Sequence, residues 1–329
     1  MSTSLRVEAH ASNSIPTHHR KRFAIGDHIP LLVLVVLCVV ATLISDRFLT
    51  AVNLSNVLLQ ASILTVLAIG MTFVVINGGF DLSVGSTAAL AGCLGAMVTF
   101  TMGAAAGVLV AVLTGCGAGL LNGLIIAKLR VSPLIATLGT MVLIRGVVLL
   151  VTDGAPIQAL DEVDEMFVLI GTGRLFGVPI LPCIVAVVFA IGYWVLHHSV
   201  LGFRVFAVGG NEQAAAICGI RVDRVKILAF TLCGGLAGFA GFLLSARLQS
   251  GQPTAGEFYE LTAIAAVVLG GAALKGGEGR LFNSVVGVFI MVLLGNVLNL
   301  AGVGTYWQRV AVGLVIVAAA AADQLRHRR

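Results

Sequence analysis

The feature that most constrains this chain is a series of long apolar runs separated by short polar segments. A bilayer core about 30 Å thick is crossed by roughly 20 apolar residues in a helix. We expect ten helical spans, at about 29–44, 54–76, 84–102, 104–127, 131–152, 178–196, 227–245, 261–274, 281–301 and 307–323. The span at 261–274 is short and rich in glycine, so we expect it to be tilted, broken or partly re-entrant.

The composition excludes a soluble protein. Apolar residues make up 58% of the 329 residues and charged residues only 11%, whereas soluble domains carry roughly 25% charged residues. A disordered chain is excluded as well, because disorder requires low hydrophobicity and high net charge. The chain is therefore expected to be an all-α polytopic membrane protein with about ten transmembrane helices.

The distribution of positive charge predicts the orientation in the membrane. The net charge is +5, and Lys and Arg are enriched in the cytoplasmic loops of membrane proteins. With ten spans and a cytoplasmic N-terminus, fifteen basic residues fall in cytoplasmic segments, and three fall outside: Arg47, Arg174 and Arg247. We predict that both termini are cytoplasmic, and we interpret the basic balance as a membrane signature rather than as nucleic-acid binding.

The predicted organisation is one transmembrane domain over residues 29–323. A polar cytoplasmic tail (1–28) precedes it and a basic cytoplasmic tail (324–329) follows it. The cytoplasmic loop 197–226 is too short to contain an independent core. We therefore expect no separate soluble domain.

No residues have the spacing of a catalytic or metal site. The six cysteines form neither a CxxC pair nor a Cys/His cluster, and no histidine in a span accompanies a nucleophile. The phosphate-binding pattern GxxxxGK[ST] is also missing from the sequence. We expect this chain to have no catalytic residues, no metal site and no cofactor of its own.

A glycine-rich interruption separates the second and third spans. It contains Asn77, Gly78, Gly79, Asp81 and Ser83. The side-chain oxygens of Asp81 and Ser83 can cap the next helix by accepting from its free N–H groups. Alternatively, the interruption is a broken helix beside a substrate cavity, because irregular backbone at membrane depth must be buried or face water. These five residues are candidates for the translocation path or its gating.

Further polar residues lie inside the predicted spans. Arg145 is about 10 Å from the outer end of its span, where a charge is a functional candidate unless it extends to the membrane surface. Asn122, Asn296 and Asn299 are suited to hydrogen bonds between helices. We retain Arg145, Asn296 and Asn299 as candidates for the translocation path or gating.

Glycines cluster on two of the spans. Gly115, Gly117, Gly119 and Gly123 form one predicted surface, and Gly234, Gly235, Gly238 and Gly241 form another. Small residues let helix backbones approach closely in a membrane. The pattern is typical of plain helix packing, and it also suits helices that slide during gating.

The cytoplasmic loop contains a stretch with the signals of a short capped helix. Asn211 is a favourable N-cap, and Glu212 complements the positive end of the helix dipole. Ala214 and Ala215 favour helix, and Gly219 suits the position after the helix end. Seven helical residues span about 10 Å, too little to cross a bilayer. Such a helix fits either a groove in another protein or the lipid headgroup surface.

Several motifs, in order along the chain, resemble the ribose/xylose/arabinose-type sugar permeases of bacterial ATP-binding cassette importers. They are residues 70–86 (GMTFVVINGGFDLSVGS), 132–141 (SPLIATLGTM), Arg145-Gly146, 201–215 (LGFRVFAVGGNEQAA), 268–272 (VLGGA), 296–300 (NVLNL) and 306–308 (YWQ). The resemblance extends from about residue 30 to the C-terminus.

The resemblance implies an importer-type permease fold in the bacterial inner membrane. It implies a second permease copy, cytoplasmic ATP-binding subunits that hold ATP and Mg, and a periplasmic or extracellular sugar-binding protein. It also implies alternating access driven by the partner ATPases. Residues 209–220 match the coupling segment that the ATPase grips, which comprises Gly209, Gly210, Asn211, Glu212, Ala214, Ala215 and Gly219.

Three other functions remain alternatives at this point. The first is a related importer permease for branched-chain amino acids or nucleosides. The second is a secondary transporter that needs no ATPase, although such proteins often carry carboxylates at the membrane midplane and here the acidic residues map to loops or span ends. The third, a membrane-embedded enzyme, is disfavoured because no catalytic pair is found.

Overall fold

The computed structural model describes residues 29–159 and 163–326. The predicted tail 1–28 and the last three residues of the basic tail lie outside this part of the chain. The helices are α1 (Ile29–Ile44), α2 (Ala51–Ile76), α3 (Val84–Met102), α4 (Ala104–Lys128), α5 (Pro133–Thr152), α6 (Glu165–Thr172), α7 (Ile180–His198), α8 (Val200–Gly210), α9 (Glu212–Ile217), α10 (Val222–Leu248), α11 (Tyr259–Leu269), α12 (Leu281–Leu300) and α13 (Thr305–Arg326). A short antiparallel hairpin precedes α7. Its strands, β1 (Arg174–Leu175) and β2 (Val178–Pro179), have two residues each.

The all-α fold class is confirmed, and each of the ten predicted spans coincides with a helix. Within residues 29–159 and 163–326, seven helices are long and apolar enough to cross a membrane: α2, α3, α4, α5, α7, α10 and α12. The predicted span at 261–274 is shorter than expected, because α11 ends at Leu269 and a glycine turn follows. The number of membrane crossings and the side on which the termini lie stay predictions.

Local sequence accounts for several helix ends. Pro133 occupies the first turn of α5, where its missing N–H costs no helical hydrogen bond. Gly103 alone separates α3 from α4 and has a φ of 87°, a conformation that is readily adopted only by glycine. This single residue reverses the chain between two membrane helices.

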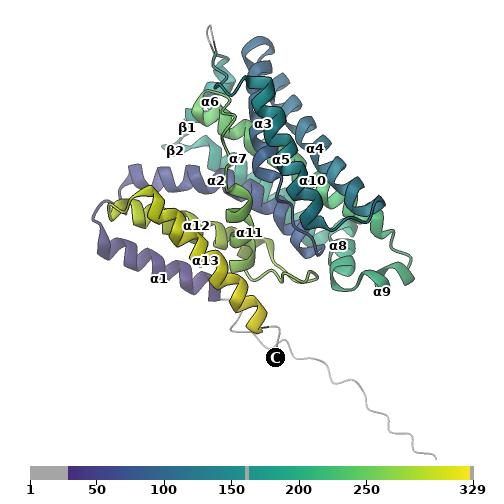
Figure 1. Ribbon diagram of the computed structural model, residues 1–329. Helices are drawn as coiled ribbons and strands as arrows, with labels where there is room; N and C mark the ends of the chain where they lie inside the picture. The colour runs from purple at the N-terminus through teal and green to yellow at the C-terminus, as the bar shows by residue number, and fades with distance from the viewer. Residues whose placement is uncertain (1–28, 160–162, 327–329) are drawn as a thin grey trace, which may run out of the picture.

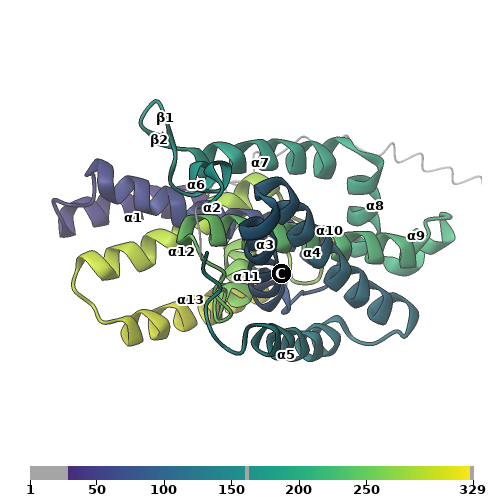
Figure 2. The ribbon, with the colours of Figure 1, turned by 90° about the horizontal axis from the view of Figure 1, so that it is seen from above.

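Helix α10 lies at the centre of the molecule and packs against α2, α3 and α4. In both ribbon views α3, α4 and α5 lie on one side of the molecule with α10, whereas α1, α12 and α13 lie together on the other (Figures 1 and 2). Helix α2 is buried along nearly all of its length from Ala61 to Ile76. A helix that is apolar on every side is expected in such a buried position.

Glycines bring α4 and α10 into backbone contact, as their clustering predicted. A Cβ atom added at Gly115 would overlap the carbonyl oxygen of Gly234, and one added at Gly119 would overlap the carbonyl oxygen of Phe230. Gly117 is different, because a Cβ atom there would meet nothing within 4 Å. The predicted surface therefore consists of Gly115, Gly119 and Gly123, while Gly117 points away from α10.

The apolar residues that are exposed lie on the outer helices. In α1 only Pro30 and Ala41 are buried, and α5 and α7 expose Leu150, Val187 and Trp194, among others. Exposed apolar surface of this extent is expected where lipid surrounds the protein, because lipid tails are as apolar as these side chains and contact with them costs no free energy of hydration. The fold is that of an integral membrane protein.

We predict that Gly115→Ala destabilises the protein and that Gly117→Ala does not. The added methyl group must push α4 away from α10 at the first position, with a cost of about 1–3 kcal/mol, whereas alanine in open space favours the helix by roughly 0.5–1 kcal/mol. Thermal unfolding of the two purified variants in one detergent measures the difference. Equal melting temperatures would contradict the packing described here.

Candidate functional site

Helix α9 is a short projection between α8 and α10, as the loop sequence predicted. The Asn211 side chain accepts a hydrogen bond from the Ala214 N–H at 2.9 Å. Gly219 follows the helix with a φ of 82°, which is the conformation expected after a helix end. Figures 1 and 2 show α8 and α9 at the end of the molecule farthest from α1.

The surface of α9 contains an apolar residue that sequence analysis did not single out. Ile217 is 88% exposed. Because the helix is too short to cross the membrane, this exposure is not explained by a membrane-spanning position. Ala215 is buried and packs in a cluster with residues of α8 and α10, such as Val208 and Val225. Ala215 thus attaches α9 to the protein, whereas Ile217 is available to a partner. The sequence signal that could have identified Ile217 is an isoleucine in the last turn of a short helix predicted to lie outside the membrane.

A polar cavity of about 450 Å³ lies beside α9. Its lining residues are Ile126, Ala127, Arg130, Val131, Ser132, Pro133, Glu212, Asp223 and Lys226. Two ion pairs border it, Lys226–Glu212 at 2.7 Å and Lys128–Asp223 at 2.8 Å. These ion pairs link α9 and the C-terminal end of α4 to the first turns of α10.

Three glycine-containing segments meet next to the end of α2. The Gly277 N–H donates to the Ile76 carbonyl oxygen at 2.8 Å, and a Cβ atom added at Gly209 would overlap that same oxygen. A Cβ atom added at Gly276 would lie 2.9 Å from the backbone of Gly78. The C-terminal end of α8, immediately before α9, is therefore in direct backbone contact with the interruption that follows α2.

A polar network fixes the interruption to α4 and α5. Asp81 is 1% exposed, and its carboxylate accepts from the Ser83 N–H and hydroxyl at 2.9 and 2.6 Å. Asn122 in α4 donates to the Ser83 hydroxyl at 2.8 Å and accepts from Thr140 in α5 at 2.7 Å. Ser83 itself is the N-cap residue of α3 but makes no side-chain cap bond. Asp81 thus bonds to the N-cap residue rather than to the first turn of the helix.

Asn77, Asn296 and Asn299 lie in different environments. Asn77 ends α2 and is buried, and its side-chain oxygen has no hydrogen-bond partner within residues 29–159 and 163–326. Asn296 exchanges hydrogen bonds of 2.7 and 3.1 Å with Asn53 and thereby joins α12 to α2. Asn299 is exposed near the end of α12. Asn122 and Asn296 thus form the predicted bonds between helices.

A cavity of about 570 Å³ lies at the opposite ends of α2 and α10 from α9, with α11 and α12 completing its wall. Its polar lining residues are Gln60, Arg247, Gln252, Thr254, Tyr259 and Thr262. The apolar ones are Leu64, Leu244, Leu248, Ala255, Met291 and Val292, with Gly256 and Gly295. None of the eight residues retained from the sequence as path or gating candidates lines this cavity, and their role in transport stays a prediction.

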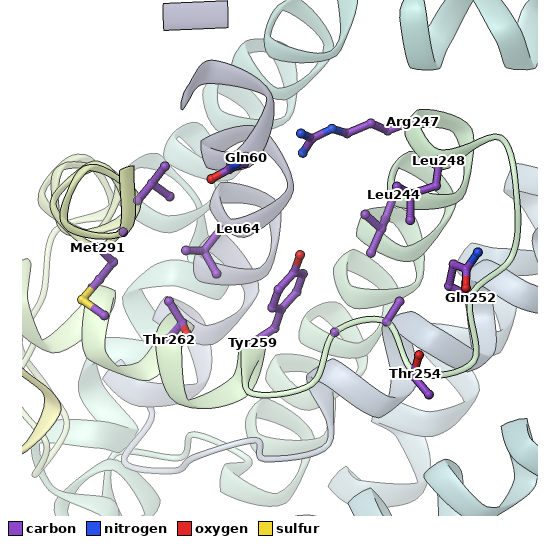
Figure 3. Close-up of a pocket in the computed structure, with 14 residues that line it drawn as sticks. Gln60, Leu64, Leu244, Arg247, Leu248, Gln252, Thr254, Tyr259, Thr262 and Met291 are labelled. Atoms are coloured by element: carbon purple, nitrogen blue, oxygen red, sulfur yellow. The ribbon is translucent and has the colours of Figure 1, made fainter. Parts of the chain in front are cut away.

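The polar side chains converge on the space between α2 and α10. Figure 3 shows the Arg247 guanidinium pointing toward Gln60 across the cavity and the Tyr259 hydroxyl pointing between them. The lining contains amides, hydroxyls and one guanidinium but no carboxylate. Such groups form hydrogen bonds with a polyhydroxylated molecule, and they offer no anionic partner to an ammonium group.

Helix α10 connects the two functional regions. It begins at Val222, beside the ion pairs that border α9, and ends at Leu248 in the cavity wall. Its 27 residues form an unbroken helix, about 40 Å long. One continuous helix therefore joins the neighbourhood of α9 to Arg247.

The family model for the permease component of branched-chain amino acid transport systems matches residues 53–320. The chain belongs to this permease family. It is 43% identical to the ribose import permease protein RbsC of Escherichia coli (strain K12) over 295 residues, which cover 89% of this chain and 92% of the relative. RbsC of Bacillus subtilis (strain 168) is 43% identical over 90% of this chain and 92% of its own length. The L-arabinose transport system permease protein AraH of Escherichia coli (strain K12) is 37% identical over 91% of this chain and 90% of its own length. No solved structure matches.

These findings confirm the resemblance drawn from the sequence motifs. The chain is a membrane permease subunit of an ATP-binding cassette importer. An ATP-independent secondary transporter and a membrane-embedded enzyme are no longer competing interpretations.

We predict that Gly209→Ala impairs transport and that Gly117→Ala, in α4, does not. A methyl group at Gly209 displaces α8 from the Ile76 carbonyl oxygen, whereas a Cβ atom at Gly117 meets nothing within 4 Å. Overpacking of this kind costs about 1–3 kcal/mol. Uptake by cells that contain equal amounts of the two variants measures the effect, and equal uptake would exclude a role for this contact.

Proposed function

We propose that this chain moves a monosaccharide or a related polyol across the bacterial inner membrane. The observation that carries the proposal is the 43% identity to the ribose import permease over 92% of that protein's length. The lining of the cavity supports it, because amides and hydroxyls at Gln60, Gln252, Thr254, Tyr259 and Thr262 can replace the hydrogen bonds that sugar hydroxyls make with water.

Branched-chain amino acids are the substrate class that the family description itself names. A zwitterionic amino acid carries an ammonium group, and burying this charge is costly unless an acidic or carbonyl partner is present. The 14 residues that line the cavity include no acidic residue, but the side-chain carbonyl groups of Gln60 and Gln252 can accept from an ammonium group and Arg247 can bind a carboxylate. The proposal of a sugar rather than an amino acid therefore rests on the 43% identity to the ribose import permease. A nucleoside, which also carries a ribose ring, is distinguished by the transport test below.

The proposed mechanism is alternating access driven by partner subunits. Two permease copies form the pathway, a sugar-binding protein delivers the substrate outside, and cytoplasmic subunits bind ATP and Mg. Their closure displaces α9, and α10 conveys that movement to the cavity. To shift the outward and inward states from 1:99 to 99:1, the partners must supply about 5.5 kcal/mol of differential binding.

We propose that Ile217 is the apolar anchor of the ATPase contact. It is 88% exposed on a helix whose other face is attached to the protein through Ala215. Buried apolar anchors at the centre of an interface contribute a large share of its binding energy. Glu212 takes part in an ion pair with Lys226, so it holds α9 rather than reaching freely toward a partner.

The transport test uses vesicles that contain this chain with its ATPase and binding protein. We expect ATP-dependent uptake of radiolabelled ribose or a related monosaccharide, and no uptake of leucine. Uptake of leucine or of a nucleoside without sugar uptake would overturn the proposed substrate class. Sugar uptake at full rate without nucleotide would overturn the coupling to ATP.

The docking test compares Ile217→Asp with Phe176→Asp. Both replace an exposed apolar residue, 88% and 99% exposed, with a charge, but Phe176 lies in the hairpin before α7, at the predicted outer side. A lost anchor of about 2 kcal/mol weakens binding more than tenfold. We therefore expect the ATPase to co-purify with the Phe176 variant and to be lost from the Ile217 variant. Equal recovery would exclude Ile217 as the anchor.

A further inference from the structure

The segment between α10 and α11, residues 249–258, is irregular backbone that runs among the membrane helices. Gly251 packs against Cys93 in the middle of α3, and Gly256 packs against Gly85 in the first turn of the same helix. The segment therefore follows α3 for eight residues, or about 12 Å. Three of its residues have positive φ: Gln249 at 53°, Gly256 at 72° and Phe258 at 65°.

Irregular backbone in this position needs hydrogen-bond partners from the protein, because lipid supplies none. One such bond joins the Ile157 N–H to the Gly251 carbonyl, and the Gly251 N–H donates to the Ile157 carbonyl in return. Further along, the Nη1 atom of Arg145 donates to the carbonyl oxygens of Pro253 at 2.6 Å and Ala255 at 3.1 Å. The arginine that the sequence identified inside α5 is thus bonded to the backbone of this segment.

The same segment forms one wall of the cavity proposed to pass the sugar. Gln252, Thr254, Ala255 and Gly256 all line it. Thr254 lies between the two residues whose carbonyl groups bind Arg145. Arg145 itself does not line the cavity. Its charge therefore lies behind the wall, where it acts on the position of Thr254 and not on the substrate.

A second arginine holds the far end of the segment. The Arg309 guanidinium in α13 lies 5.2 Å from the ring centroid of Phe258, within the range of a cation–π contact. Glu260, just after the segment, lies near enough to Arg145 to interact electrostatically. Arg145 and Arg309 thus both contact this irregular segment.

We propose that Arg145 is a positioning residue that holds segment 249–258 as a fixed wall of the sugar pathway. This inference rests on the proposed transport function. Without the two hydrogen bonds the carbonyl groups of Pro253 and Ala255 lose their partner, and the wall at Thr254 becomes mobile. The coupling between ATP hydrolysis and sugar movement then falls, because a mobile wall no longer closes the pathway behind the sugar.

The side-chain chemistry defines an informative set of variants. Both hydrogen bonds come from one nitrogen, Nη1, so the three donors of a lysine ammonium can replace them. Methionine fills similar space but donates no hydrogen bond. Arg145→Met is therefore the disruptive variant and Arg145→Lys the conservative one. Arg174→Met, in the exposed hairpin before α7, is the matched control for loss of an arginine.

The first measurement reports the mobility of the wall. A spin label is attached to Thr254→Cys, or to Thr262→Cys in α11 as a reference, in a chain whose six native cysteines are replaced and which melts at the same temperature as the unmodified protein. We expect Arg145→Met to increase label mobility at position 254 but not at 262, and Arg145→Lys and Arg174→Met to leave both unchanged. Unchanged mobility at 254, or an equal increase at both positions, would overturn the proposal.

The second measurement counts sugar molecules moved per ATP hydrolysed by the reconstituted complex. This ratio is independent of the amount of folded protein. We expect Arg145→Met to lower the number of sugar molecules moved per ATP about threefold or more. We expect Arg145→Lys to keep most of the normal value. A normal ratio in Arg145→Met would refute the positioning role. If instead the unmodified complex moves no sugar at all, the proposed function fails, while the spin-label result still decides whether Arg145 fixes the wall.

Discussion

The structure depends on one constraint: within lipid, every backbone N–H and C=O group must find its partner inside the protein. Regular helices meet this requirement by themselves, and two of the irregular segments between them meet it partly through buried polar side chains. At residues 77–83 the side chains of Asp81, Ser83 and Asn122 form a buried network. At residues 249–258 Arg145 donates to two carbonyl groups. Charged residues in the apolar part of the protein thus lie beside the breaks in its helices.

The two breaks lie next to the two regions that a transporter must connect. The first follows α2, whose last residue, Ile76, is in backbone contact with the end of α8, which leads into α9. The second follows α10 and forms a wall of the cavity. Between them α10 is continuous and contacts α4 through glycines. Backbone contact without interlocking side chains resists separation of two helices more than it resists sliding along them. Movement of α9 is therefore expected to shift α10 as a rigid body.

Much of this arrangement could be predicted from the sequence, because its causes are local. Apolar length indicated each of the ten helices, Asn211 and Gly219 indicated the ends of α9, and the spacing of glycines indicated the contact face of α4. The cavity could not be predicted in this way. Its polar residues come from α2, α10, α11 and the segment before α11, and no local pattern brings Gln60 beside Tyr259. The partners of Arg145 are backbone carbonyl groups, which leave no signature in a sequence.

The positive charge of Arg247 in the cavity affects which solutes can bind there. Arg247 is half-buried and has no acidic partner among the described residues, and its guanidinium points toward Gln60. A cation enclosed by apolar residues such as Leu64 and Leu244 repels a positively charged solute, and in a low-dielectric surrounding this repulsion acts over several ångströms. A neutral sugar meets no such barrier and can accept hydrogen bonds from the guanidinium. We therefore expect Arg247 to disfavour cationic solutes within the membrane domain itself.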